Sequence, residues 1–305
     1  MKFSFIMPVW KGKYLREAIQ SILNQTYHDF ELVIVDDCSP EPIQSIVESM
    51  STKNIHCRYY RNSENIGGHD LIAQWNHCLE YAQGEYIILA TDDDFYEPLF
   101  LSTFNQLTYK YPQVDLFRSR LLQVNADNQI LNIDSCYKEY LSQEEFTYHM
   151  LHDMKGGIPQ YIFKRKTLQA HGGFVNFPKA WASDDATAIM MAEHGCVNSQ
   201  EHLVRFRWSD INISSNTSDL TEKVKARILY NQWLKDNIPP INPKSEWTDF
   251  YQKNIRSYLD LYNKITLVST IKTGSLQQKI KCYHVLYQKG INTYELLSII
   301  YHTLI

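Results

Sequence analysis

Three consecutive aspartates, Asp92, Asp93 and Asp94, directly follow the apolar run 85–90 of this 305-residue chain. Adjacent carboxylates repel one another, so such a cluster is unfavourable unless water solvates it or a cation binds it. Mg²⁺ is commonly held by one or two carboxylates together with the phosphates of a substrate. The cluster therefore indicates either a divalent metal site that carries a diphosphate or the acidic start of a helix, with Pro98 in its first turn.

Residues suited to nucleotide binding follow two earlier predicted strands. Pro8 and Val9 end the first strand, where a base can lie against the backbone, and Trp10 can either stack on that base or pack in the core. Asp36 and Asp37 end the second strand, where they can accept hydrogen bonds from a uracil or a ribose. The alternative for these two is an Asx turn, but a turn does not require two adjacent carboxylates, so we favour nucleotide binding.

The elements that would position these residues alternate between strand and helix. Short β-branched and aromatic runs predict strands at 3–9, 30–35, 55–61 and 86–90. Apolar residues at helical spacing predict helices between them at 14–24, 43–50 and 70–82. Gly84 suits a left-handed cap after the last of these helices. The alternation predicts an α/β fold with a doubly wound, mostly parallel sheet and flanking helices, which binds ligands at the carboxyl ends of its strands.

The pattern is looser after residue 98. The further strands are predicted at 116–124, 129–133 (a hairpin with its turn at 125–128), 161–164 and 203–208. The further helices are predicted at 99–111, 142–151, 167–171 and 183–194. From Thr221 onward the chain is predicted to be helical. We therefore expect a nucleotide-binding and catalytic domain over 1–220 and a helical carboxyl-terminal region over 221–305.

Charge is unevenly distributed along the chain, whose net charge is −4. Residues 1–220 contain 18 Lys and Arg against 28 Asp and Glu, whereas residues 221–305 contain 12 against 6. The basic, aromatic-rich tail can contact an anionic membrane or a lipid-linked substrate, and the alternative is a solvated helical face.

Other signals limit the class of protein. The six cysteines contain no C-x-x-C pair, so the sequence indicates neither a zinc site nor a disulfide framework. No run of about 18 apolar residues predicts a membrane span. We expect a cytoplasmic protein, with peripheral attachment to the inner face of the membrane as an open alternative, and no nucleic-acid partner.

Several spaced motifs within residues 1–210 can be compared with known families. In order, they are Phe-Ile-Met-Pro-Val-Trp at 5–10, the run 14–27, Phe-Glu-Leu-Val-Ile-Val-Asp-Asp at 30–37, Asn65-x-Gly67, Asn76, the run 82–87 and Thr-Asp-Asp-Asp at 91–94. No single motif would suffice, but together they closely resemble the motifs of family 2 glycosyltransferases, and their agreement is specific. The resemblance implies the GT-A fold, whose α/β domain binds a nucleotide-sugar, and transfer of the sugar with inversion at the anomeric carbon.

The resemblance also implies roles for individual residues of the donor site. Asp92 is similar to the family's ribose contact, and Asp93, with Asp94 as a second candidate, is similar to its ligand for Mn²⁺ or Mg²⁺. Gly67 and Asn76 are expected on the nucleotide side. The cation would neutralise the charge that develops on the departing nucleoside diphosphate.

An inverting transfer also needs a base that takes the proton of the acceptor hydroxyl. The family supplies it from an acidic pair after a Gly-Gly-Phe motif, which stands here at 172–174. Counting back from Gly195 aligns Ser183 and Asp184 with the usual Glu-Asp pair, so Asp184 is the predicted base and Asp185 its alternative. The missing glutamate departs from the family pattern. Capping of the helix by Ser183 or Asp184 is compatible with either role.

A second departure is that residues 68–76 contain no arginine, although the family often places one there near the diphosphate. Arg207 lies in a stretch that resembles the strand and loop closing over the donor phosphate. It can supply the missing positive charge, and the alternative is a surface arginine on an edge strand.

The sequence thus predicts a metal-dependent inverting glycosyltransferase. Its expected donor is a nucleoside-diphospho-sugar, with uridine diphosphate favoured, and its acceptor is a saccharide or lipid-linked saccharide in surface polysaccharide or glycolipid assembly. The alternative is a non-catalytic nucleotide-sugar-binding scaffold in a polysaccharide assembly complex, which the degenerate pair at 183–184 would explain.

Overall fold

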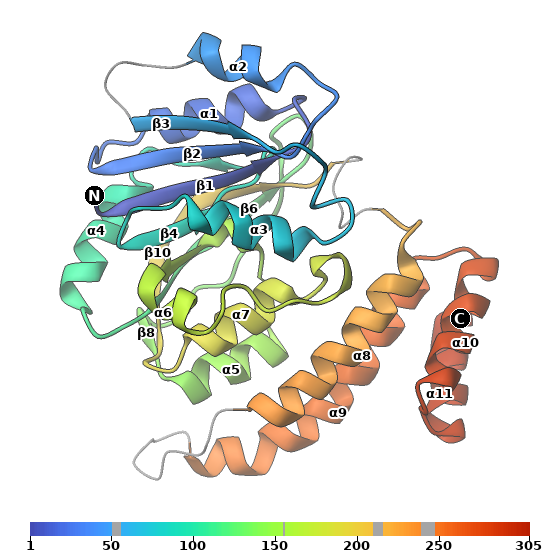
Figure 1. Ribbon diagram of the computed structural model, residues 1–305. Coiled ribbons are helices and arrows are strands. Elements are labelled where there is room, and N and C mark those ends of the chain that lie inside the picture. Colours follow the sequence, from blue (N-terminus) through green and yellow to red (C-terminus); the bar gives the residue numbers. More distant parts are fainter. Residues whose placement is uncertain (51–55, 155, 210–215, 239–247) are drawn as a thin grey trace.

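A single large sheet with helices on both faces forms the amino-terminal two thirds of the chain, and a group of long helices packs beside it (Figure 1). This computed structural model describes residues 1–305 except 51–55, 155, 210–215 and 239–247. Within the described residues, the strand order along the sheet is β3-β2-β1-β4-β9-β6-β10-β5.

The first half of the sheet is parallel. Its strands are β1 (Phe3–Val9), β2 (Phe30–Asp36), β3 (His56–Arg61) and β4 (Tyr86–Leu89). Strand β1 pairs with β2 and β4, and β3 pairs with β2. Because helices cover both faces, β2 is buried along its whole length, which explains the continuous apolar run at 32–35 within it. The predicted parallel α/β sheet is confirmed.

The second half of the sheet is mixed. Strand β9 (Tyr161–Lys164) runs antiparallel between β4 and β6 (Leu116–Val124), and β10 (Cys196–Arg207) lies parallel to β6. Three short strands complete it, namely β5 (Phe95–Tyr96), β7 (Ile130–Ile133) and β8 (Tyr140–Leu141). Strands β6 and β7 form the predicted hairpin. Strand β10 starts earlier than predicted, and β5 and β8 were missed because two residues are too few to show an alternation.

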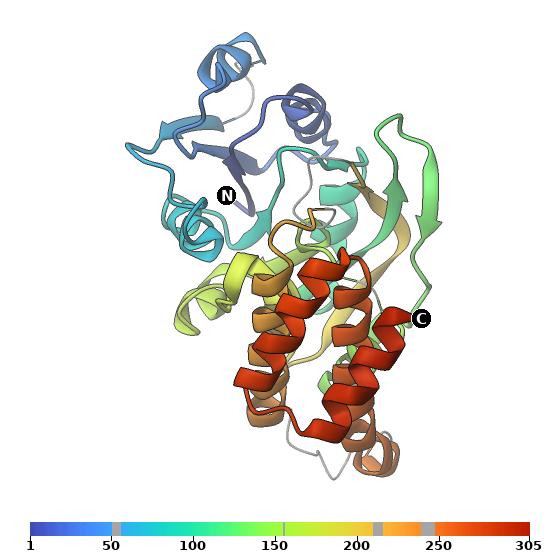
Figure 2. The ribbon, with the colours of Figure 1, turned by 90° about the vertical axis from the view of Figure 1, so that its right-hand side faces the viewer.

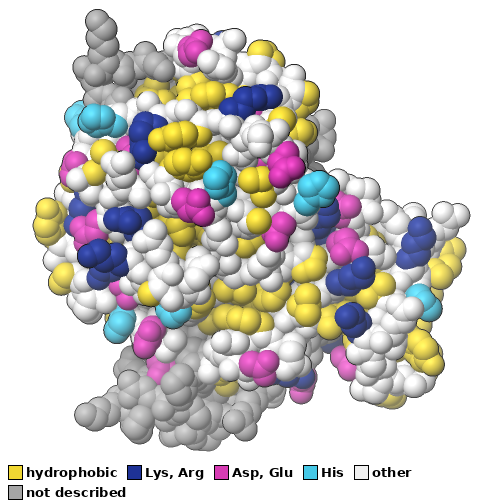
Figure 3. Space-filling model, viewed as in Figure 1, with side chains coloured by type: hydrophobic (Ala, Val, Ile, Leu, Met, Phe, Trp, Pro, Cys, Tyr) yellow, Lys and Arg dark blue, Asp and Glu magenta, His cyan; other side chains and the backbone are white. Residues whose placement is uncertain are grey.

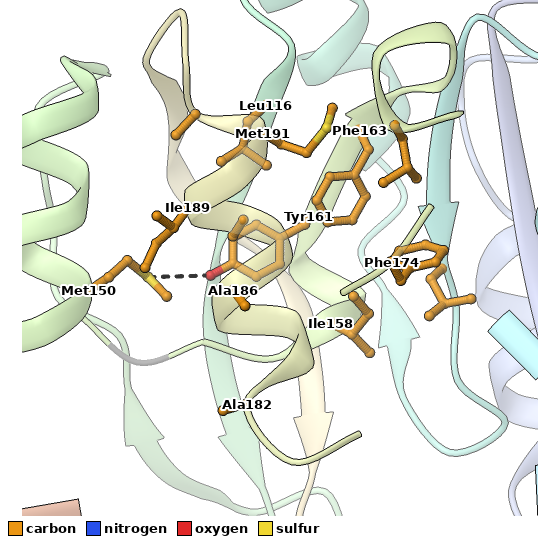
Figure 4. Packing of buried hydrophobic residues seen from close by; sticks show 14 of the residues in the cluster. Leu116, Met150, Ile158, Tyr161, Phe163, Phe174, Ala182, Ala186, Ile189 and Met191 are labelled. Atoms are coloured by element: carbon orange, nitrogen blue, oxygen red, sulfur yellow. Dashed lines mark hydrogen bonds between the residues drawn. The ribbon is translucent and has the colours of Figure 1, made fainter. Parts of the chain in front are cut away.

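Two apolar clusters fill the space between the sheet and its helices. The helices of this part are α1 (Leu15–Leu23), α2 (Ile43–Met50), α3 (Leu71–Glu80), α4 (Phe100–Lys110), α5 (Gln143–His152), α6 (Arg165–Ala170) and α7 (Ser183–Met191). Helices α1, α2 and α4 contribute to one cluster, and α3, α5, α6 and α7 contribute to the other. Figure 4 shows the second cluster around Tyr161, whose hydroxyl lies 3.6 Å from the sulfur of Met150. This packing anchors α7, the helix on which the predicted base lies.

The prediction that Gly84 caps helix α3 is wrong, and the structure gives another reason for a glycine at this position. Helix α3 ends at Glu80 with Tyr81 as its cap, and Gly84 is not among the glycines with positive φ. A Cβ at Gly84 would lie 2.6 Å from the carbonyl carbon of Phe3 and 2.7 Å from the backbone nitrogen of Ser4. Glycine is needed there because the backbone passes β1 too closely for any side chain.

Within the described part of the carboxyl-terminal region the chain forms four helices, in agreement with the helical prediction from residue 221. They are α8 (Leu220–Asn237), α9 (Thr248–Lys272), α10 (Leu276–Gln288) and α11 (Thr293–Leu304) (Figure 2). Helices α8 and α9 share the apolar cluster of α3, α5 and α7 through Ala226, Tyr230, Leu234, Ile255 and Leu259. Helices α10 and α11 pack on α8 and α9 in a separate cluster. The helices within the described residues fall short of the length and apolarity needed to cross a bilayer.

Candidate functional site

A pocket of about 1240 Å³ lies between the carboxyl ends of β1 and β4 and the carboxyl-terminal helices. One wall carries 8–11, Asp37, the loop 65–68 and 91–94, which all follow parallel strands. The end of α5, the start of α7 and side chains of α8 and α9 also line the pocket. The sheet therefore gathers residues far apart in the sequence at the edge where ligands bind in α/β folds.

Trp10 is 40% exposed and lines the pocket together with Pro8 and Val9. This exposure excludes the alternative that Trp10 packs in the core. Asp92 holds this strand end in place, since its Oδ2 accepts hydrogen bonds from the backbone N–H groups of Trp10 at 3.1 Å and Lys11 at 2.9 Å. Asp92 thus fixes the place where a nucleoside would contact β1.

Asp93 and Asp94 differ in how much of their hydrogen-bonding capacity the protein already uses. Asp94 is buried, its Oδ1 accepts from the backbone N–H of Arg207 at 2.7 Å, and its Oδ2 accepts from the hydroxyl of Thr91 at 2.6 Å. Asp93 is half-buried in the pocket wall. Burial and the neighbouring Asp92 carboxylate raise the pKa of Asp93 to about 6. A cation would relieve both effects, so Asp93 is the better placed of the two predicted metal ligands.

The expectation that Arg207 supplies positive charge to a donor phosphate is wrong. Arg207 is buried, and its guanidinium donates to the carbonyls of Asp93 at 3.0 Å and Ala126 at 2.9 Å and to Glu17 at 2.5 Å. It also lies 4.0 Å above the ring of Tyr14. Alternation along β10 explains the difference, because the pocket is lined by the neighbours of Arg207 at 206 and 208. Arg207 instead ties the aspartate cluster to α1.

The two aspartates that end β2 have separate roles. Asp36 is fully buried and lies outside the pocket wall; it accepts hydrogen bonds from the backbone N–H of Ser39 and the hydroxyl of Tyr59, and forms an ion pair with Arg61. The expected nucleotide contact of Asp36 is therefore wrong, because the Asx turn considered as its alternative and this ion pair use its carboxylate. Asp37, by contrast, lies in the pocket wall.

Asp37 holds the loop that contains Gly67. Its Oδ1 accepts from the backbone N–H of Ile66 at 2.9 Å and the amide of Asn62 at 2.8 Å, and its Oδ2 accepts from the backbone N–H of Gly67 at 2.8 Å. A Cβ at Gly67 would lie 2.9 Å from Asp37 Oδ2. Both residues thus shape the pocket wall that follows β2.

Asn76 also has a structural role. Its Oδ1 accepts from the backbone N–H of Phe174 at 2.9 Å, and Asn76 does not line the pocket. Gly173 has φ of +94°, and a Cβ there would lie 2.2 Å from Asn76 Oδ1. Asn76 thus holds the Gly-Gly-Phe loop that leads to α7, and its contact with a donor stays a prediction.

Asp184 and Asp185 lie at the start of α7 and line the same pocket as the aspartate cluster. Helix α7 has no side-chain cap: Ser183 is buried and accepts from the backbone N–H of Phe177 at 3.1 Å, and Asp184 Oδ1 accepts from the N–H of Asp185 at 3.0 Å. Burial raises the pKa of Asp184, and burial together with Asp184 raises that of Asp185 to about 7. Two carboxyls with raised pKa values in a pocket suit proton transfer near neutral pH.

Helices α8 and α9 contribute pocket residues that the sequence did not indicate. Arg227 of α8 lies beside Asp185, and Tyr258 and Tyr262 of α9 extend the wall. Trp181 adds an aromatic surface, with the ammonium group of Lys223 4.3 Å from its ring. No local motif marks these residues, because helical spacing of Lys, Arg and Tyr is equally typical of a solvated helix face.

Comparisons with known proteins agree with this geometry. The family model described as "Glycosyl transferase family 2" matches residues 4–119. The chain is 39% identical over 104 residues to the putative colanic acid biosynthesis glycosyl transferase WcaA of Escherichia coli strain K12. The aligned residues make up 33% of this chain and 36% of WcaA. It is 34% identical over 98 residues to the poly(ribitol-phosphate) beta-N-acetylglucosaminyltransferase TarS of Staphylococcus aureus strain Mu50. The aligned residues make up 31% of this chain and 17% of TarS. The chain thus spans only a minor part of these curated relatives.

Solved structures share the fold over nearly the whole chain. The structure of S. aureus TarS 1-349 in complex with UDP-GlcNAc has a TM-score of 0.66 at 16% identity and covers 94% of this chain and 80% of that one. The structure of the mannosyltransferase PcManGT from Pyrobaculum calidifontis, in complex with GDP-Man and Mn²⁺, has a TM-score of 0.58 at 17% identity. That alignment covers 99% of this chain and 87% of the mannosyltransferase chain. The fold is therefore that of GT-A glycosyltransferases.

Proposed function

We propose that this chain is an inverting glycosyltransferase of family 2 that uses a nucleoside-diphospho-sugar, supported by the match of the family model to residues 4–119. The observation that carries the proposal is a single pocket joining the aspartate cluster after β4 to the acidic pair of α7. The cluster suits a diphosphate and its cation, whereas the pair suits removal of a proton from an acceptor. Sugar transfer needs both functions within one cavity.

The donor would lie along the wall formed by the ends of β1, β2 and β4. Trp10 offers an exposed ring beside the backbone of Pro8, Asp37 supports the loop at Gly67, and Asp92 fixes the end of β1. We propose uridine diphosphate as the nucleotide, supported by the UDP-GlcNAc complex of the TarS neighbour. Guanosine diphosphate is the competitor to test, because the archaeal neighbour is a GDP-Man complex.

The residues present fit a divalent cation held jointly by protein and substrate. The described residues contain no group of three or more His, Cys, Asp or Glu side chains arranged as a complete metal site. Asp93 nevertheless places a carboxyl of raised pKa in the pocket wall. Mg²⁺ and Mn²⁺ can bind at sites with only one or two protein ligands when substrate phosphates supply further oxygen ligands. Asp93 would hold the cation, with Asp94 as a second candidate ligand, and the cation would neutralise the charge of the leaving diphosphate.

Asp184 is the proposed base, with Asp185 as its alternative. As the acceptor oxygen attacks the anomeric carbon, its proton passes to the carboxylate, and the bond from that carbon to the phosphate oxygen breaks. Attack from the face opposite the leaving group inverts the anomeric configuration. The presence of the pair in the same pocket as the aspartate cluster supports this assignment.

We propose a saccharide or lipid-linked saccharide of a surface polymer as the acceptor, supported by the names of the curated relatives. Helices α10 and α11 expose large apolar side chains, including Leu276, Ile280, Leu297 and Tyr301. In Figure 3, hydrophobic and Lys or Arg side chains share the surface of these helices. Such a surface supports peripheral contact with an anionic membrane. Sedimentation with anionic vesicles, but not with neutral ones, would be the expected result.

The decisive experiment separates binding from transfer. A panel of UDP-, GDP- and dTDP-sugars is incubated with the protein and Mn²⁺, and release of the nucleoside diphosphate is measured with and without saccharide acceptors. Asp184→Asn should abolish transfer while Mn²⁺-dependent nucleotide binding, measured by calorimetry, remains. Asp93→Asn should instead abolish the Mn²⁺ dependence of binding. Binding without turnover of any donor by the natural protein would favour the non-catalytic scaffold.

A further inference from the structure

Arg227 of α8 lies against the acidic pair of α7. Its Nη1 is 4.0 Å from Asp185 Oδ2 and donates a hydrogen bond to the hydroxyl of Tyr262 on α9 at 3.4 Å. The side chains of Arg227 and Asp185 are only 15% and 18% exposed. Water therefore screens the two charges weakly, so their interaction is stronger than that of a surface pair.

The other groups that face Asp185 do not provide a positive charge. Asp184 comes from α7 itself, Tyr161 comes from β9, Tyr230 comes from α8 and Tyr262 comes from α9. Burial raises the pKa of all three tyrosines, so they stay neutral at physiological pH. Among these described groups Arg227 is the cation, and it opposes the mutual repulsion of the two carboxylates.

The guanidinium of Arg227 is incompletely bonded. Its Nε is buried and has no hydrogen-bond partner among the described residues. Its 4.0 Å separation from Asp185 exceeds the length of a direct hydrogen bond. An unused buried donor is unfavourable, so a purely structural arginine would be expected to satisfy it. Arg227 also lines the pocket with Asp184 and Asp185, where an entering polar group can complete its bonding.

We propose that Arg227 is a positioning residue for sugar transfer, whose positive charge keeps the Asp184–Asp185 pair ionised so that Asp184 can accept the acceptor's proton. This inference rests on the proposed function. Burial and the neighbouring Asp184 already raise the pKa of Asp185, while Arg227 lowers it. Without Arg227, one proton would bind the pair at higher pH and block the base. Helix α8 is then part of the reaction machinery, although it lies far outside residues 4–119.

The first test is the pH dependence of kcat/KM. Arg227→Met keeps an unbranched side chain but removes the charge, and it should move the acidic limb of the profile by about one pH unit or more toward higher pH. Arg227→Lys keeps the charge and should retain the natural profile. Lys225→Met is the matched control, because Lys225 lies on the same helix and pairs with Glu222 at the surface. A uniform loss of activity at every pH in Arg227→Met would overturn the proposal.

The second test needs no turnover. Carbon-13 NMR titration of labelled aspartate carboxyls, assigned with Asp185→Asn, should show a higher pKa for Asp185 in Arg227→Met than in the natural protein or Lys225→Met. An unchanged titration would refute the charge coupling even if the protein transfers sugar. A raised pKa in a protein that turns over no donor would instead refute the proposed function. If Arg227→Met does not fold, as circular dichroism would show, Arg227→Gln is titrated in its place and judged by the same outcomes.

Discussion

Replacing Arg207 by methionine should destabilise the protein rather than act mainly on donor binding. The guanidinium of Arg207 is buried and donates to two backbone carbonyls, those of Asp93 and Ala126. Hydrogen bonds from a charged donor contribute about 1.5–3 kcal/mol each, so losing these two costs roughly 3–6 kcal/mol. The stacking over Tyr14 adds about 1 kcal/mol.

Two further contributions complete the estimate of the lost stability. Glu17 is 56% exposed, so its ion pair with Arg207 contributes about 0–1 kcal/mol. The methionine side chain fills part of the vacated space and returns about 1–2 kcal/mol of apolar burial. We therefore expect Arg207→Met to lower the free energy of unfolding by about 2–7 kcal/mol.

Equilibrium unfolding in urea, followed by circular dichroism, measures this change. Glu17→Gln is the matched control, since it removes only the exposed partner and should cost under about 1 kcal/mol. If Arg207→Met unfolded within 1 kcal/mol of the natural protein and lost only nucleotide affinity, the structural role of Arg207 would be refuted.

Further predictions concern the sheet, the nucleotide wall and pH. Gly84→Ala should cost at least about 2 kcal/mol in urea unfolding, because its Cβ would lie 2.7 Å from the backbone nitrogen of Ser4; an unchanged midpoint would contradict that contact. Gly67→Ala should weaken nucleotide binding about tenfold, as measured by calorimetry, because the added methyl group would lie too close to the Asp37 carboxylate. An unchanged affinity would contradict the proposed position of the nucleotide beside Gly67. The pKa of Asp185 is raised to about 7, so the folded state binds the extra proton and stability falls as pH rises from about 4 to 7. In Asp185→Asn the free energy of unfolding should depend less on pH across this window. If its fall with rising pH persisted, another group would be responsible for it.

Much of the fold could be predicted because local pattern and tertiary environment agree. Strand β2 contains the continuous apolar run 32–35 and is buried on both faces, and the spacing of apolar residues in α1 matches the face that it buries. Strands β5 and β8 were missed because two residues carry no periodicity; tertiary pairing with β10 creates them. The glycine at 84 was recognised as special, but its reason, close approach to β1, depends on a segment distant in the sequence.

The site divides in the same way. The sequence by itself determined which carboxylates follow the strands and begin α7, since their order and spacing are local properties. Only the tertiary structure decided that Asp37 lines the pocket while Asp36 is neutralised by Arg61, and that Arg207 is buried whereas Arg227 reaches the acidic pair. The physical reason is that a charged side chain is used according to its burial and its partners. Both are set by helices and strands that meet only when the chain is folded.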